Sequence, residues 1–173
     1  MPESPSPTVV LVGPPAAGKT KVGKELAKKL AMPFIDTDRM IEAEHGPIPQ
    51  IFAQYGEQEF RRLERDAIRH ALHSDGVVSL GGGAVTVEDN RRDLRGFPVV
   101  LLWISDDAVS PRLNNPKRPL LATGGLPAWK ALVDARTPWY REVATHTVDV
   151  SHRSVDDVAE DIRGWLESKE LTP

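Results

Sequence analysis

The chain has 173 residues, of which 40% are hydrophobic, and a formal net charge of −3. This length supports one domain with a substantial core, so we expect a single domain over residues 1–173. The balanced charge gives no overall attraction to nucleic acid or acidic membranes, and we expect neither as a partner. The sequence has no cysteine, no signal-like start and no long apolar stretch, which favours a cytoplasmic protein without disulfides. We also expect a monomer.

Apolar runs that indicate strands alternate along the chain with patterns that indicate helices. After a loose, proline-rich leader at residues 1–7, the expected strands lie at residues 8–12, 33–35, 77–80, 99–104 and 146–150. The expected helices lie at residues 21–31, 39–45, 49–55 and 57–73, after Pro127, at 139–144, and behind a cap at Ser154. This alternation predicts a three-layer α/β/α fold with a mostly five-stranded parallel sheet. Its ligands should lie beyond the carboxyl ends of the strands.

The first expected strand leads into a segment that fits the pattern G-x-x-x-x-G-K-[ST] of a P-loop. Backbone N–H groups of such a loop and the N-terminus of the next helix bind phosphate oxygens. Lys19 is expected to reach the β- and γ-phosphates, and the Thr20 hydroxyl to bind Mg²⁺. An ordinary glycine turn is the alternative. The predicted nucleotide-binding residues are Gly13, Pro14, Pro15, Ala16, Ala17, Gly18, Lys19 and Thr20.

Two more clusters follow later strands. Asp36 and Asp38 come after the second expected strand, and Gly81, Gly82 and Gly83 come after the third. Parallel strands bring their carboxyl ends to one edge, so these clusters should share a crevice with the P-loop. Two acids at i and i+2 after a strand would project the same way. Asp38 would alternatively cap the next helix.

Five motifs behind the P-loop, taken in order, resemble those of the shikimate kinases, which have a P-loop kinase architecture like that of nucleoside monophosphate kinases. They are Asp36-Thr37-Asp38, Glu57-Gln58-Glu59-Phe60-Arg61-Arg62, Leu80-Gly81-Gly82-Gly83-Ala84, Lys117-Arg118-Pro119-Leu120-Leu121 and Arg136-Thr137-Pro138-Trp139-Tyr140. The match spans residues 8–163. The resemblance implies transfer of the γ-phosphoryl group of ATP to the 3-hydroxyl of shikimate, with Mg²⁺.

The resemblance also implies roles for residues on the acceptor side, in a segment at about residues 36–64 and beyond it. Asp38 matches the residue that holds the acceptor hydroxyls and is the candidate catalytic base, and Asp36 matches one on the magnesium side, acting through water. Forked guanidinium groups suit a carboxylate. The substrate-binding set is Asp38, Arg61, Gly81, Gly82, Gly83 and Arg136. A surface pair with Glu57 is the alternative for Arg61.

On the nucleotide side, the irregular stretch at about residues 110–125 resembles the family's lid. Arg118 matches the lid arginine that meets charge developing during transfer, and we expect it, with Lys19 and Asp38, to be catalytic. A solvated loop charge is the alternative for Arg118. Arg112 and Arg153 resemble residues on the adenine side and complete the ATP-binding set.

Two positions depart from the usual family pattern. Ala16 stands where many members have glycine, and Lys21 where many have a small hydroxyl residue. Alanine tolerates positive φ poorly, so Ala16 is expected to restrict the loop. Two alternatives to a shikimate kinase therefore stay open: a P-loop kinase for another acceptor, such as a gluconate-type or nucleotide kinase, and a nucleotide-binding regulatory module without transfer activity.

Overall fold

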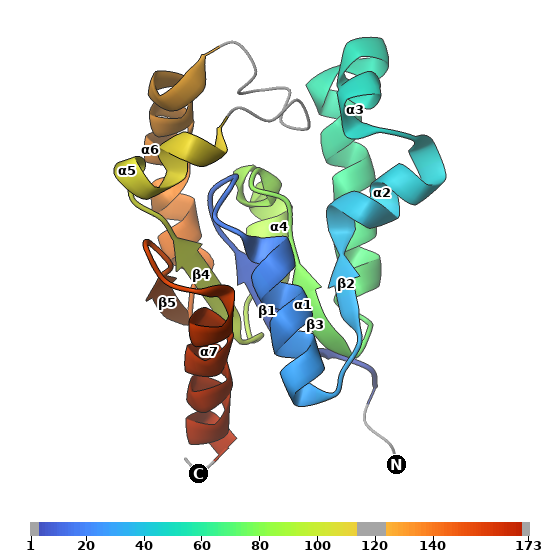
Figure 1. Ribbon diagram of the computed structural model, residues 1–173. Coiled ribbons are helices and arrows are strands. Elements are labelled where there is room, and N and C mark those ends of the chain that lie inside the picture. The colour runs from blue at the N-terminus through green and yellow to red at the C-terminus, as the bar shows by residue number, and fades with distance from the viewer. Residues whose placement is uncertain (1–3, 114–123, 171–173) are drawn as a thin grey trace.

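The computed structural model describes residues 4–113 and 124–170, and its centre is one parallel sheet (Figure 1). The strands are β1 (Pro7–Val12), β2 (Phe34–Asp36), β3 (Gly76–Ser79), β4 (Val99–Trp103) and β5 (His146–Asp149). Their order is β2-β3-β1-β4-β5, and each neighbouring pair is parallel. The expected five-stranded sheet is confirmed, and the carboxyl ends of all its strands lie at one edge.

Helices cover both faces of this sheet (Figure 1). The longer helices are α1 (Lys19–Leu30), α3 (Ile48–Ala71), α6 (Gly125–Val143) and α7 (Val155–Glu170). The shorter ones are α2 (Thr37–His45), α4 (Glu88–Asp93), α5 (Asp106–Val109) and the 3₁₀ turns η1 (Ala84–Thr86) and η2 (Ser110–Arg112). No described helix is long and apolar enough to cross a membrane.

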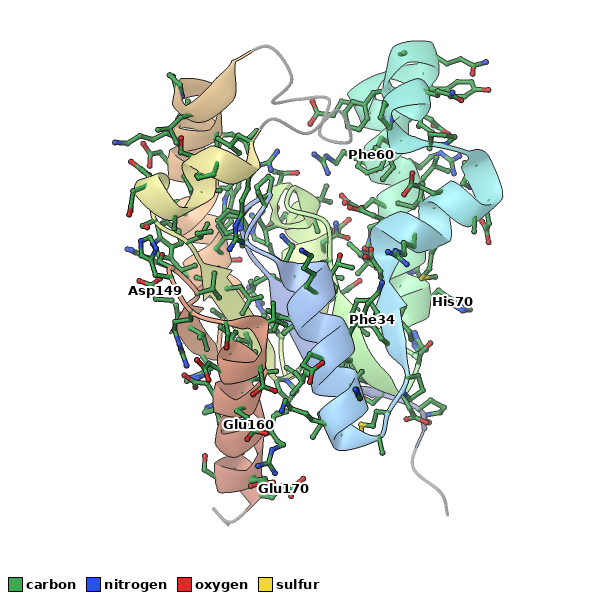
Figure 2. All side chains as sticks on the ribbon, in the orientation of Figure 1. Phe34, Phe60, His70, Asp149, Glu160 and Glu170 are labelled. Carbon is green, nitrogen blue, oxygen red and sulfur yellow. The ribbon has the colours of Figure 1, made fainter. Side chains whose placement is uncertain are left out.

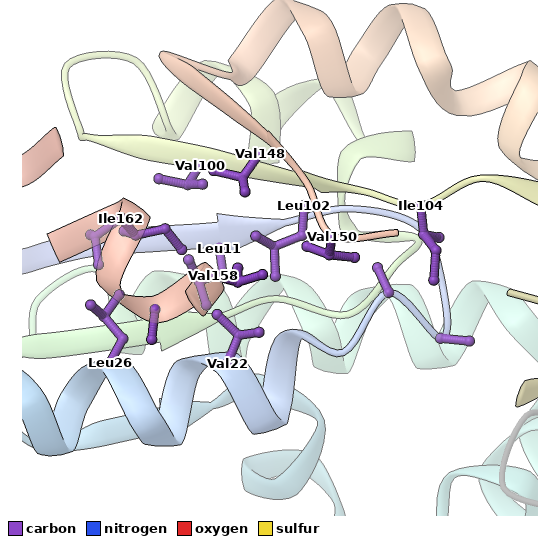
Figure 3. Close-up of a cluster of buried hydrophobic side chains, with 14 of the residues drawn as sticks. Leu11, Val22, Leu26, Val100, Leu102, Ile104, Val148, Val150, Val158 and Ile162 are labelled. Atoms are coloured by element: carbon purple, nitrogen blue, oxygen red, sulfur yellow. The ribbon is translucent and has the colours of Figure 1, made fainter. Parts of the chain in front are cut away.

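Alternate side chains of β1 enter two separate cores, as the two-residue period of a strand requires. Val9 and Leu11 pack with α1 and α7, while Val10 and Val12 pack with α3 and the end of α6. Figure 3 shows the first core, where Leu26 and Ile162 meet the strands. Each side chain buried in this way contributes about 1.5–3 kcal/mol, so the buried sheet is a rigid base for the loops at its carboxyl edge.

The sequence predicted two helices after residue 125, whereas α6 is one helix that continues through Pro138. A proline inside a helix removes a backbone hydrogen bond and costs about 3 kcal/mol. The Thr137 hydroxyl donates to the Val133 carbonyl at 2.7 Å, and Trp129 and Tyr140, which come before and after the proline in the sequence, are both buried. Packing along the whole length of α6 therefore outweighs the local break.

The break expected at Gly56 is confirmed. Gly56 lies inside α3 with φ 83° and ψ 173°, which are not helical angles, so helical segments lie before and after it. The sequence pattern does not predict α4, α5 or the two 3₁₀ turns, because these elements are too short to show a helical period.

Candidate active site

A cleft of about 780 Å³ opens at the carboxyl edge of the sheet. In Figure 1, α2 and α3 stand on one side of this edge and α5 and α6 on the other. The cleft brings together most of the predicted nucleotide and metal residues with part of the acceptor set. Its lining includes Pro15, Ala16, Ala17, Gly18, Lys19, Thr20, Asp36, Asp38, Gly81, Gly82, Arg112 and Arg153.

The loop from Gly13 to Thr20 has the backbone geometry that phosphate binding needs. Gly13 has φ 150° and lies so close to the Leu102 carbonyl oxygen that a β-carbon there would collide with it. Gly18 has φ 91° at the N-terminus of α1, where the unpaired N–H groups of the helix begin. The Lys19 ammonium donates to the carbonyls of Gly13 and Pro14, both at 2.8 Å, which holds this cation beside the loop.

Ala16 has a φ of 69°, in the left-handed region that alanine tolerates poorly. This conformation costs a non-glycine residue roughly 1–2 kcal/mol. Two contacts hold it: the Ala16 side chain is buried in the core beside α1, and its carbonyl accepts from Arg112 at 3.1 Å. Alanine is therefore accommodated without opening the loop.

Asp36 joins the loop to the acceptor side. Its Oδ2 accepts from the Thr20 hydroxyl at 2.9 Å, while its Oδ1 accepts from the backbone N–H groups of Asp38 at 3.0 Å and Arg39 at 3.4 Å. The helix cap is therefore Asp36, and Asp38 lies in the first turn of α2. Both acids line the cleft, as expected. Strand alternation does not bring them together, because β2 ends at Asp36 and Asp38 belongs to α2.

The buried Glu64 and the half-buried Asp38 form an acidic pair around Gly81. A β-carbon on Gly81 would lie 2.7 Å from Asp38 Oδ1 and 2.9 Å from Glu64 Oε2, so any larger residue would displace these carboxylates. Neither of these oxygens has a hydrogen-bond partner among the described residues. Burial, with the nearby charges of Glu64 and Asp36, raises the pKa of Asp38 to about 7, and burial raises the pKa of Glu64.

Arg61 is held against this pair. Its Nη1 donates to Glu64 Oε1 at 2.8 Å and its Nη2 to Glu57 at 3.3 Å, so the expected surface pair exists but is the longer of the two. Its side chain is 13% exposed, and the guanidinium lies directly against Gly83. Phe60, labelled in Figure 2, lies under the guanidinium with its ring centroid at 5.2 Å. The arginine is thus fixed beside the glycine loop rather than spread over the surface.

Arg136 reaches the same cluster from α6. It is 6% exposed, and its charge lowers the pKa of Glu64 against the effect of burial. Two cations therefore lie close to one buried carboxylate, which suits the binding of a second, external carboxylate. Arg61, Gly83 and Arg136 do not line the main cleft, whereas Asp38, Gly81 and Gly82 do, so the predicted acceptor residues form a cluster at the side of the cleft.

The two adenine-side candidates, Arg112 and Arg153, line the cleft together with Val155 and Val158. Arg112 contacts the P-loop, and Arg153 is tied to Asp161 at 3.1 Å. Lys21 also lines the cleft. Arg118 lies outside the described residues.

Three residues at this site have no role predicted from the sequence: Glu64, Trp129, and Tyr140, which is only the last residue of the fifth family motif. Glu64 falls on the apolar stripe of its helix, four residues after Phe60 and four before Ile68, and an acid on such a stripe was the available signal. The Trp129 indole donates to the Pro15 carbonyl at 2.9 Å, and the Tyr140 hydroxyl donates to the Gly82 carbonyl at 2.6 Å. Aromatic residues on a helix usually indicate only core, so neither residue stood out.

A P-loop and a cluster of buried charged residues at one edge of a five-stranded parallel sheet define a P-loop kinase. Comparison with known proteins narrows this class. The family model described as shikimate kinase matches residues 15–167, and the chain belongs to the shikimate kinase family. Members are ATP-dependent phosphotransferases that act on a hydroxyl.

Individual relatives and a solved structure support membership of this family. The chain is 46% identical to a shikimate kinase of Mycobacterium avium (strain 104) over 86% of this chain and 87% of the other. It is 46% identical to one of Mycobacterium bovis (strain BCG / Pasteur 1173P2) over 94% of each chain. A solved shikimate kinase of Acinetobacter baumannii, in complex with shikimate, superposes with a TM-score of 0.90 at 34% identity and covers 98% of this chain and 97% of that one. The gluconate-type and inactive alternatives are not favoured.

Proposed function

We propose that the chain transfers the γ-phosphoryl group of MgATP to the 3-hydroxyl of shikimate, and that residues of the cleft and of the charged cluster beside it bind the two substrates. The observation that carries this proposal is that the P-loop and the cluster of Asp38, Glu64 and Arg61 meet at one edge, with the glycine loop between them. The related Acinetobacter baumannii enzyme, whose structure holds shikimate, supports the same acceptor for this chain.

The triphosphate would bind along the P-loop, where backbone N–H groups and the α1 N-terminus surround its oxygens. Lys19, now on the carbonyls of Gly13 and Pro14, would turn to the β- and γ-phosphates. Thr20 and Asp36 supply a hydroxyl and a carboxylate 2.9 Å apart, hard oxygen donors of the kind that Mg²⁺ takes, the second through water. When bound, Mg²⁺ neutralises phosphate charge and orients the γ-phosphoryl group.

The acceptor would bind with its carboxylate between Arg61 and Arg136 and with backbone N–H groups of Gly81, Gly82 and Gly83 around it. Asp38 would accept the proton of the attacking 3-hydroxyl. The hydroxyl oxygen then bonds to the γ-phosphorus, while the bond between the γ-phosphorus and the bridging oxygen of the β-phosphate breaks and ADP leaves. A carboxylate with a pKa of about 7 suits a base at neutral pH. Buried oxygens of Asp38 and Glu64 that lack described partners would accept from acceptor hydroxyls.

Arg112 and Arg153, which line the cleft, would contact the adenine side of ATP. We propose that Arg118, within the lid segment at 110–125, meets the charge that develops during transfer, a role worth about 10³–10⁵ in rate in related phosphoryl transferases. The lid would also exclude water, which competes with the acceptor hydroxyl.

The test is release of ADP from ATP and Mg²⁺ with four kinds of acceptor: shikimate, quinate, gluconate and nucleoside monophosphates. We expect the highest turnover with shikimate, the ligand in the solved structure of the related Acinetobacter baumannii enzyme. Turnover with another acceptor and none with shikimate would contradict the proposal. Binding of ATP with no turnover in any mixture would point to the regulatory alternative.

A further inference from the structure

Helix α6 presents three polar groups to the site from one of its faces. Trp129, Arg136 and Tyr140 are all buried, at positions 7 and 4 residues apart. A helix with 3.6 residues per turn places such positions on one stripe, and the 11 residues from first to last rise about 16 Å. The stripe therefore spans the active site from the phosphate loop to the acceptor pocket.

The N-terminal end of this stripe holds the phosphate loop. The indole N–H of Trp129, which is 1% exposed, donates to the Pro15 carbonyl at 2.9 Å. Pro15 has no N–H of its own, so its carbonyl is the backbone group through which a neighbour can orient this part of the loop by a hydrogen bond. The contact joins positions 114 residues apart in the sequence.

The C-terminal end holds the glycine loop. The Tyr140 hydroxyl donates to the Gly82 carbonyl at 2.6 Å, across 58 residues of sequence. Burial raises the pKa of Tyr140 to about 12, so the hydroxyl remains a donor throughout the physiological range. The charges of Arg136, Arg61 and Glu64 all act on this hydroxyl, which places the contact beside the carboxylate pocket.

The two loops also touch each other. A β-carbon on Gly82 would lie 3.0 Å from Cγ and Cδ of Pro15, so the glycine loop packs on the ring of the phosphate loop's second proline. The residue held by Trp129 is thus in contact with the residue held by Tyr140. One rigid helix fixes both sides of this contact.

We infer that Trp129 and Tyr140 are positioning residues, which set the distance between the bound triphosphate and the bound acceptor by fixing the phosphate loop against the glycine loop. In-line transfer depends on this distance, and a displacement of about 1 Å lowers the rate by roughly 100-fold. Neither residue touches a reacting atom. The inference rests on the proposed function, because it assumes that the two loops carry the two substrates.

The test is steady-state kinetics of Tyr140→Phe, Trp129→Phe and the double variant, with Tyr55→Phe and Trp165→Phe as matched controls. Tyr140→Phe removes a single oxygen and keeps the ring, whereas Tyr55 is exposed and Trp165 lies on α7. We expect each site variant to lower kcat about tenfold, with the KM for ATP unchanged within twofold. The kcat of the double variant should fall by much less than 100-fold, the product of the two single losses, because both residues hold the same contact.

Rates are measured well below each variant's unfolding temperature, so that a loss of stability does not appear as a loss of kcat. A purely structural role predicts a lower melting temperature with kcat within twofold of the wild type, as for the two controls, and this result would overturn the inference. Fully additive losses in the double variant would overturn the shared contact. Absence of wild-type turnover with shikimate would instead reject the proposed function and is a separate outcome.

Discussion

The protonation of Asp38 depends on the groups around it. An exposed aspartate titrates near 3.8, but burial beside Glu64 and Asp36 raises the pKa of Asp38 to about 7, against the attraction of Lys19. A base must be ionised to accept a proton. We therefore expect log(kcat/KM) for shikimate to rise with unit slope up to about pH 7 and then level off. A profile that stays flat from pH 5 to 8 would contradict this assignment.

Replacing Asp38 by asparagine gives a second, independent measurement. We expect kcat to fall by at least about 100-fold, because the base is lost. The folded pKa lies above the unfolded value, so the stability that this group contributes at low pH is lost as pH rises from about 4 to 7. Asp38→Asn should therefore raise the melting temperature at pH 8 and do so less at pH 5. Equal increases in melting temperature at pH 5 and pH 8 would show that folding does not raise the pKa of Asp38.

Arg61 offers a test of the carboxylate pocket. Charge-assisted hydrogen bonds contribute about 1.5–3 kcal/mol, so Arg61→Ala should raise the KM for shikimate roughly 10- to 100-fold and change the KM for ATP little. Arg61→Lys is the matched variant: it keeps a cation beside Glu64 but loses the fork, and an intermediate KM is expected. Equal increases in the KM for shikimate and the KM for ATP would show that Arg61 does not bind the carboxylate of shikimate.

At the scale of elements, the junction of β2 and α2 serves two purposes through Asp36. One oxygen caps α2 and the other faces Thr20. Serine also caps helices well, so Asp36→Ser should keep the free energy of unfolding, whereas Asp36→Ala should lower it by about 1 kcal/mol. Both variants should raise the Mg²⁺ concentration needed for half-maximal rate, because both lose the carboxylate. An unchanged Mg²⁺ requirement in Asp36→Ser would show that Asp36 acts only as a cap.

The glycine loop shows how elements distant in sequence make one pocket. Gly81 separates two acids that come from α2 and α3, and Gly83 lies against Arg61 of α3. Gly82 meets the P-loop and α6. Side chains at these positions would fill the space that the proposed acceptor needs. The glycines therefore matter here for close approach rather than for turn geometry.

At the scale of the whole molecule, the two substrates would bridge parts of the chain that the sheet brings together at one edge. A ligand present at 100 times its Kd adds about 2.7 kcal/mol to the free energy of unfolding. For a domain of this size that corresponds to a rise of roughly 5–11 °C in melting temperature. We expect this rise with ATP and Mg²⁺ and with shikimate, measured by thermal scans. Gluconate at the same concentration should give none, and an equal rise with gluconate would argue against the acceptor pocket described above. Since one chain supplies groups for both substrates, a monomer would suffice, as we propose.

Local patterns in the sequence were enough for the P-loop, the alternation of strands and helices, and the break at Gly56. These features depend on neighbours in the chain: a strand followed by a glycine loop and a helix, or a residue that tolerates positive φ. The helix through Pro138 was missed because long-range packing, with Trp129 and Tyr140 both buried, overcame a local signal. Asp36 rather than Asp38 caps α2 because the helix begins at Thr37, two residues earlier than expected.

The phosphate loop, the parallel sheet and, through ordered motifs, the family can be predicted from the sequence, because each depends on residue types at fixed spacing. That Glu64 is buried beside Asp38, and that burial raises the pKa of Asp38 to about 7, follows only from the folded structure. The tertiary structure also decided that Trp129 and Tyr140 hold two separate loops. Burial and contacts between distant segments set these properties, and neither depends on spacing along the chain.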